Sequence, residues 1–144
     1  MFDQILQLVK DQMGGNSSAS AAIPAGQEDA VHHEIATHIN EGLQNQASSQ
    51  GGVGGLMSML TGSMGSGSPI TSAIEGGLAS SLGSKFGLPP MATGAIAAAL
   101  PGILQKFAHK ANDPNDSSIT ADSMSSAFSG GGSGIGGMLG GLFK

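Results

Sequence analysis

The sequence contains no cysteine, no tryptophan and no tyrosine, and all five of its basic residues are lysine. Without cysteine the chain can form no disulfide and perform no thiol chemistry, which fits a reducing compartment. Aromatic residues make up 3% of the chain, so the core must be built from small aliphatic side chains and methionine. This composition predicts modest stability for a single copy, and self-association is a common remedy.

Charge is also scarce, at 10% of the residues, and ten acidic side chains outnumber the five lysines to give a net charge of −5. Phosphate contacts dominate the affinity of proteins for nucleic acid, and they require a basic stripe that scattered lysines do not form. Nucleic acid is therefore not an expected partner. Weak association with it is the least favoured alternative.

Long apolar runs and the pattern of a secretory signal are not expected in this sequence either. The first residues alternate polar and apolar side chains and carry no cationic region, so they do not have the pattern of a secretory signal. No apolar stretch approaches the roughly 20 residues that cross a membrane. We expect a soluble cytoplasmic protein without a transmembrane segment.

What the sequence does contain is an internal repeat. Ile23-Pro24 and Leu88-Pro89 each open a helix-like run, and the runs superpose at an offset of 65 residues. The aligned apolar pairs are Ile23/Leu88, Ala30/Ala95, Val31/Ile96, Ile35/Leu100 and Ile39/Leu104. Residues 56–62 also match residues 124–130 at an offset of 68. Such self-similarity indicates duplication of a helical module.

Apolar residues at helical spacing predict an all-α fold with two tandem three-helix modules, residues 1–65 and 66–129, in one pseudo-symmetric array. The expected helices cover 2–13, 24–44 and 56–60 in the first module, and 70–86, 89–107 and 119–128 in the second. A Gly/Ser/Ala linker is expected at 14–22. Pro101 falls inside a helical run and predicts a kink near 97–101.

Residues 130–144 differ in kind and form a predicted flexible, glycine-rich tail. A spacer at 130–134 precedes apolar residues at positions i, i+3, i+4, i+7 and i+8, with glycine between them. These residues are Ile135, Met138, Leu139, Leu142 and Phe143. Glycine disfavours an isolated helix, so the tail is expected to order when its apolar face is covered. These five residues are the candidate interaction site.

The run from His33 to His38 resembles a zinc-protease motif with one residue too many. Positions i and i+5 lie about 140° apart on a helix, so the two histidines cannot share a metal. Glu34, His38 and Glu41 do share a face, which leaves a metal site there open beside a solvated edge with helix ion pairs. No second element closes such a site. We therefore predict no metal and no cofactor.

Several motifs together resemble a known family. They are the Ile23-Pro24 and Leu88-Pro89 helix starts, the Ala-Leu-Pro-Gly-Ile-Leu run at 99–104, the segment Asn112-Asp113-Pro114-Asn115-Asp116, and the Gly-Met-Leu-Gly-Gly-Leu-Phe run at 137–143. The chain is similar to the bacterial YidB-like family of unknown function over most of its length, most clearly over 70–144. This resemblance implies an all-helical cytoplasmic bacterial protein, with a helical array sometimes likened to homeodomain-type folds. It implies no activity, cofactor or catalytic residue.

No glycine-rich segment is followed by the Lys-Ser/Thr of a phosphate loop, and no serine lies in a nucleophile elbow. We therefore predict a non-enzymatic protein, a homo-oligomer or scaffold that uses helix faces and the apolar tail to bind itself or another protein. The alternative is a small-ligand or peptide-binding module that uses the groove between the two proline-started helices.

Overall fold

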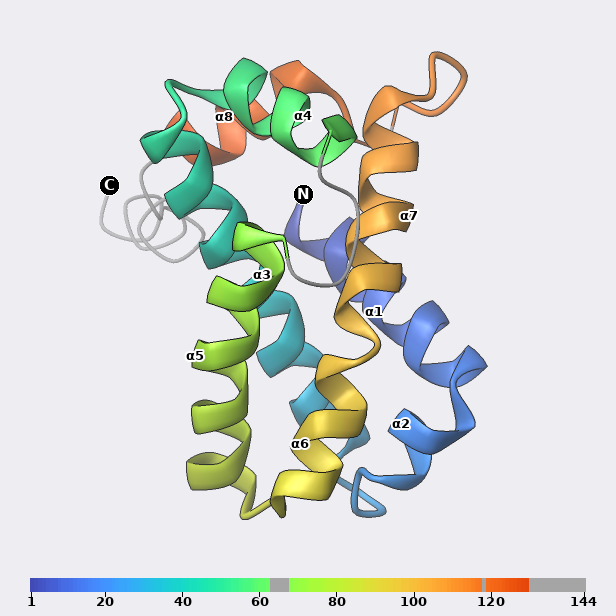
Figure 1. The fold of residues 1–144 in the computed structure, drawn as a ribbon. Helices are drawn as coiled ribbons and strands as arrows, with labels where there is room; N and C mark the ends of the chain where they lie inside the picture. Colours follow the sequence, from blue (N-terminus) through green and yellow to red (C-terminus); the bar gives the residue numbers. More distant parts are fainter. Residues whose placement is uncertain (63–67, 118, 130–144) are drawn as a thin grey trace, which may run out of the picture.

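A computed structural model describes residues 1–62, 68–117 and 119–129, and these residues form an all-helical fold without a β-strand (Figure 1). The helices are α1 (Phe2–Gly15), α2 (Ser17–Ala21), α3 (Glu28–Ser49), α4 (Val53–Gly62), α5 (Pro69–Phe86), α6 (Pro90–Ala97), α7 (Leu100–Asn112) and α8 (Ala121–Ser129). The predicted all-α class is confirmed. The tail at 130–144 and the predicted module boundary at 65 and 66 lie outside the described residues.

Helix α3 is central to the packing, since it contacts α1, α4 and α5. The helices α6 and α7 follow α5 in the chain, and α6 contacts α5 and α2 whereas α7 contacts α1, α4 and α5. Figure 1 shows α4 and α8 together at one end of the molecule and α6 at the other. The 22 residues of α3 correspond to a length of about 33 Å, which sets the scale of the separation between these ends.

One apolar core joins side chains from all the described helices. The predicted stripe on α3 is buried at Val31, Ile35, Ile39 and Leu43. The predicted stripe on α5 is buried at Ile70, Ile74, Leu78 and Leu82. The largest fully buried side chain is Phe107 on α7, and aliphatic residues and Met13 fill most of the remaining interior. The helices on the two sides of the predicted boundary therefore share a single core.

Local sequence signals set the ends of α5 and the break between α6 and α7. The Ser68 hydroxyl caps α5 by accepting a hydrogen bond from the Thr71 N–H, and Gly87 ends the helix in the left-handed region at φ 64°. Helix α6 ends at Ala97, and α7 begins at Leu100 with Pro101 in its first turn. Where a kink was predicted near 97–101, the structure has a break between two helices, because a proline interrupts the hydrogen bonding of a continuous helix.

Three predictions in the first half were wrong. Helix α3 begins at Glu28 rather than Pro24, since Gly26 has a φ of 86° and the intervening residues form a turn. The predicted linker at 14–22 contains α2, where the Asn16 side chain accepts a hydrogen bond from the Ala19 N–H. Helix α3 also continues to Ser49, past its predicted end at residue 44. The chain thus contains more helix than propensity alone indicates.

Helices α3 and α5 approach closely at Gly42. A Cβ atom added there would lie 2.4 Å from Cγ1 of Ile74, which is buried. Only glycine permits this approach without displacement of the isoleucine, because both atoms belong to the packed interface. In contrast, Gly76 on α5 would have nothing within 4 Å of an added Cβ.

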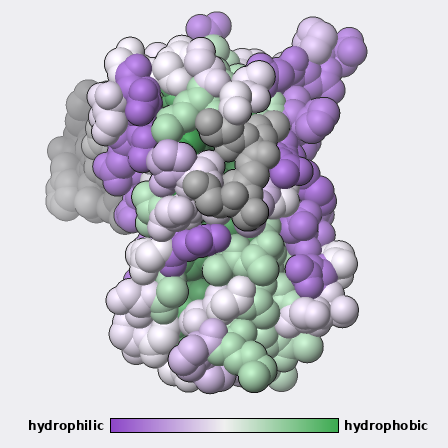
Figure 2. Space-filling view, viewed as in Figure 1, coloured by the Kyte–Doolittle hydropathy of each residue, from purple (hydrophilic) through white to green (hydrophobic). Residues whose placement is uncertain are grey.

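The surface is uneven in polarity. Figure 2 shows hydrophilic residues along the side formed by α7, and hydrophobic residues beside residues of intermediate hydropathy at the end that contains α6. Among the described residues, Met91 of α6 is the large hydrophobic side chain that is exposed, at 86%. The run Pro90–Asn112 is long and apolar enough to cross a membrane by length and composition, but half of its apolar window is buried. Core helices of soluble proteins meet the same test, so this is weak evidence for a membrane span.

Candidate functional site

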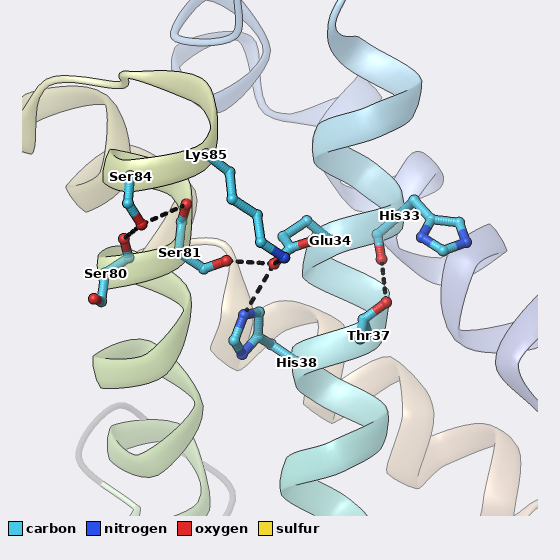
Figure 3. A network of polar contacts seen from close by, with 8 residues as sticks. All are labelled: His33, Glu34, Thr37, His38, Ser80, Ser81, Ser84 and Lys85. Carbon is cyan, nitrogen blue, oxygen red and sulfur yellow. Dashed lines mark hydrogen bonds and ion pairs between the residues drawn. The ribbon is translucent and has the colours of Figure 1, made fainter. Parts of the chain in front are cut away.

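The most connected polar cluster of the described structure lies between α3 and α5. Glu34 and His38 occupy successive turns of α3, and Ser81 and Lys85 occupy successive turns of α5 (Figure 3). Residues four apart lie on one face of a helix, so each helix presents a pair of polar side chains to the other. The packing of α3 on α5 therefore brings together residues that are 47 and 51 positions apart in the sequence.

Three groups converge on one oxygen of the Glu34 carboxylate, Oε1. The Lys85 ammonium donates a hydrogen bond to it over 2.7 Å, the Ser81 hydroxyl donates another, and His38 Nε2 lies 3.3 Å away. The Glu34 side chain is 13% exposed, whereas that of Lys85 is 60% exposed. The cluster is thus a largely enclosed carboxylate held by a cation at the surface.

These neighbours change the acidity of the carboxyl. Burial by itself would raise the pKa of Glu34, but the hydrogen bonds from Lys85 and Ser81 and the positive charge of Lys85 together outweigh it. The pKa of Glu34 therefore lies below its ordinary value of 4.5. At neutral pH the group is an anion, and the ion pair stabilises the contact between α3 and α5.

Only part of the candidate metal set is assembled here. Glu34 and His38 do meet, but Lys85 and Ser81 complete their cluster, and an ammonium group repels a metal cation. Glu41 and His38 line a hollow of about 120 Å³ beside Gly42 and Ile74. Within the described ranges, no group of three or more His, Asp or Glu side chains is arranged to hold a metal ion.

A second histidine, His32, lies at the contact between α1 and α3. Its Nδ1 atom is buried without a hydrogen-bond partner, and Lys10 and Asp29 form an ion pair of 3.2 Å near it. Burial lowers the pKa of His32, and the charge of Lys10 lowers it further, against the opposing charges of Asp29 and Glu28. The imidazole is therefore held in its neutral form more firmly than in an unfolded chain.

A hollow of about 190 Å³ lies where α8 meets α3 and α4. It is lined by Ala47, Ser48, Gly52, Val53, Ser125 and Phe128. Small-molecule sites usually enclose about 300–1,000 Å³, so this hollow is small for a ligand pocket. It adjoins the last described residues, after which the predicted tail begins.

Comparisons of the chain with protein-family models, curated proteins and solved structures return no match. The site therefore has to be interpreted from its own geometry. Sequence reasoning identified Glu34 and His38 but missed Ser81 and Lys85, because no local pattern links two helices so far apart in the chain. It also missed His32, whose Nδ1 atom is buried without a hydrogen-bond partner because the side chain packs against α1. The predicted interaction residues Ile135, Met138, Leu139, Leu142 and Phe143 lie outside the described residues.

Proposed function

We propose that this chain is a non-enzymatic self-assembling or scaffold protein of the bacterial cytoplasm. Helix faces and the apolar segment at 135–143 would make its contacts with a second copy. The resemblance to the YidB-like family motivates the bacterial and cytoplasmic parts of the proposal. The interaction role has a separate physical basis in the packing of the helices.

The observation that carries the proposal is the completeness of the described core. Every large apolar side chain of the described residues is buried or packed against the core, apart from Met91. The five apolar residues of the predicted tail lie outside the described residues. The hollows at α8 and beside Gly42, of about 190 and 120 Å³, are both small for a ligand pocket. Apolar side chains that gather on a surface favour contact with another molecule, and this is the role proposed for the tail.

The internal duplication also belongs to the proposal, with modules at 1–65 and 66–129. Four of the five aligned pairs are buried at both positions, and the exception is the pair Ala30/Ala95. The packing offers parallel support. In each proposed module, a helix with aligned core positions contacts the first helix of the other module: α3 contacts α5, and α7 contacts α1. A pseudo-twofold axis between the two modules would produce this pair of contacts.

The polar groups favour a structural role over chemistry or nucleic-acid binding. A serine nucleophile needs a neighbouring base, whereas Ser81 donates to a carboxylate already held by Lys85. Three lysines, at positions 10, 85 and 110, form ion pairs with acidic residues rather than a phosphate-binding stripe. The small hollows at α8 and beside Gly42 give no support to the alternative, a ligand-binding module.

Deletion of residues 130–144 tests this proposal. We expect the full chain to have a larger native mass in light scattering than the truncated chain at the same concentration. Circular dichroism should show that both retain the helices, because the described helices already share one apolar core. An unchanged native mass and solubility after deletion would remove the main support for the proposal.

A further inference from the structure

The exposed face of α6 is unlike the rest of the described surface. Met91 is 86% exposed, Gly94 and Ala98 are exposed, and Ala95 is partly exposed. Their spacing of i, i+3, i+4 and i+7 places them on one side of the helix. We call these four residues the α6 face. In Figure 2 hydrophobic residues occupy part of this end of the molecule, beside residues of intermediate hydropathy.

The α6 face is also free of charge. No charged residue occurs between Lys85 and Lys106, so the helix and both of its flanking turns are neutral. A strongly charged partner would lose water from its own charges against this face without gaining an opposite charge. A neutral apolar partner loses no such solvation.

We propose that the α6 face is the surface on which the apolar segment 135–143 of a second copy docks. This inference rests on the proposed self-assembly and names its contact. The segment matches the face chemically, because no charged residue occurs between Asp122 and Lys144. It also has the helical spacing of apolar residues that binds an apolar helix face or groove.

The reach of the tail favours a second copy over the same chain. Helix α8 lies near the C-terminal end of α3, where Ala47 and Phe128 line one hollow, whereas α6 follows Lys85, which pairs with Glu34. The 13 residues of α3 from Glu34 to Ala47 span about 20 Å. The six Cα–Cα steps from Ser129 to Ile135 span at most about 20–22 Å when fully extended. Docking along α6 of the same chain would therefore require a fully extended spacer, whereas docking on a second copy does not.

The hollow beside Phe128 does not offer an equivalent site within the same chain. A cavity of about 150 Å³ accepts one benzene ring, so a hollow of about 190 Å³ accommodates about one large side chain. Five apolar side chains require a longer surface. The α6 face of a second copy supplies one.

The experiment compares four full-length proteins by sedimentation velocity: the natural chain and the variants Met91→Glu, Leu139→Glu and Ala79→Glu. Met91 is in the first turn of α6, where a carboxylate is favoured by the helix dipole, so Met91→Glu should leave the fold intact. Ala79 is exposed on α5 and controls for the added charge. We expect the first two variants to raise the dissociation constant of the assembly at least about tenfold, and Ala79→Glu to leave it unchanged.

A mixture of the Met91→Glu and Leu139→Glu proteins gives the decisive test. The Met91→Glu protein keeps an intact tail and the Leu139→Glu protein keeps an intact α6 face, so an equimolar mixture should form hetero-complexes in native mass spectrometry. If Met91→Glu keeps the natural assembly, or if the mixture stays unassociated, the α6 face is not the docking surface. A loss of assembly on tail deletion with no effect of Met91→Glu would overturn this inference alone. No effect of tail deletion would overturn the proposed function itself.

Discussion

Helix α3 and the pair α6–α7 contain four of the five aligned apolar pairs of the proposed duplication, yet they differ in continuity and in surface. Helix α3 is one rod of 22 residues, and its solvent side carries histidines and carboxylates. The second stretch is divided between Ala97 and Leu100, and its first part has no charged residue. Three of the four aligned pairs within these helices are buried in both stretches, the exception being Ala30/Ala95. Burial in the core restricts which residues the aligned positions can hold, whereas exposed positions can differ between the two stretches.

This difference suits the two stretches to different roles, one in internal stability and one in external contact. The polar side of α3 is anchored to α5 through Glu34 and Lys85, which contact each other at 2.7 Å. The α6 face has no ion pair and presents methionine and alanine to solvent. Under the proposed docking, the first stretch supplies internal stability and the second supplies external contact. Mutations can test each half of this assignment.

The largest expected effect comes from truncation of an aligned core pair. Ile35→Ala and Leu100→Ala each remove a side chain that is fully buried, so each should lower the free energy of unfolding by about 2–5 kcal/mol. Chemical denaturation followed by circular dichroism measures this. Met91→Ala is the exposed control and should stay within about 0.5 kcal/mol. A loss below about 1 kcal/mol at either buried position would break the proposed equivalence.

The next effect concerns the close approach of α3 and α5. Gly42→Ala places a Cβ atom against Ile74 and should cost about 1–3 kcal/mol through overpacking. The matched variant Gly76→Ala has open space and should gain up to about 1 kcal/mol from helix propensity. Thermal unfolding of both proteins gives the comparison. Equal melting temperatures would contradict the packing of these helices.

A smaller effect is expected from the ion pair. Glu34→Gln should cost about 1 kcal/mol at neutral pH, because it removes a partly exposed pair. The pKa of Glu34 is lowered, so the ion pair contributes stability above pH 4.5, and this contribution is lost as pH falls further. The loss of unfolding free energy as pH falls below 4.5 should therefore be smaller in Glu34→Gln than in the natural chain. Glu41→Gln on the same helix is the control and should lose as much unfolding free energy as the natural chain.

The smallest of the four effects comes from His32. Its pKa is lowered from 6.5, so the unfolded chain takes up a proton first, and stability falls as pH drops below 6.5. His32→Leu should reduce the slope of stability against pH in this range, well above the range of Glu34. His33→Gln changes an exposed neighbour and should preserve the slope. Denaturation midpoints at half-unit pH intervals distinguish the two outcomes.

The helical class, the stripes on α3 and α5, and the break at Pro101 could be predicted from local sequence, because each depends on spacing or on one residue. The start of α3 could not, since the turn at Gly26 competes with the helix start that Pro24 favours. Helix α2 was missed because Ala19 is buried by packing against other helices rather than by its own pattern. The contacts of Glu34 with Ser81 and Lys85 depend on tertiary placement, which no local window contains.

The native mass of the full chain across a concentration series tests the central claim most directly. A single copy has a mass of 14.1 kDa. Sedimentation equilibrium should give a weight-average mass that rises above 14.1 kDa with concentration and approaches a multiple of it. A mass that stays at 14.1 kDa across the micromolar to millimolar range would contradict self-assembly.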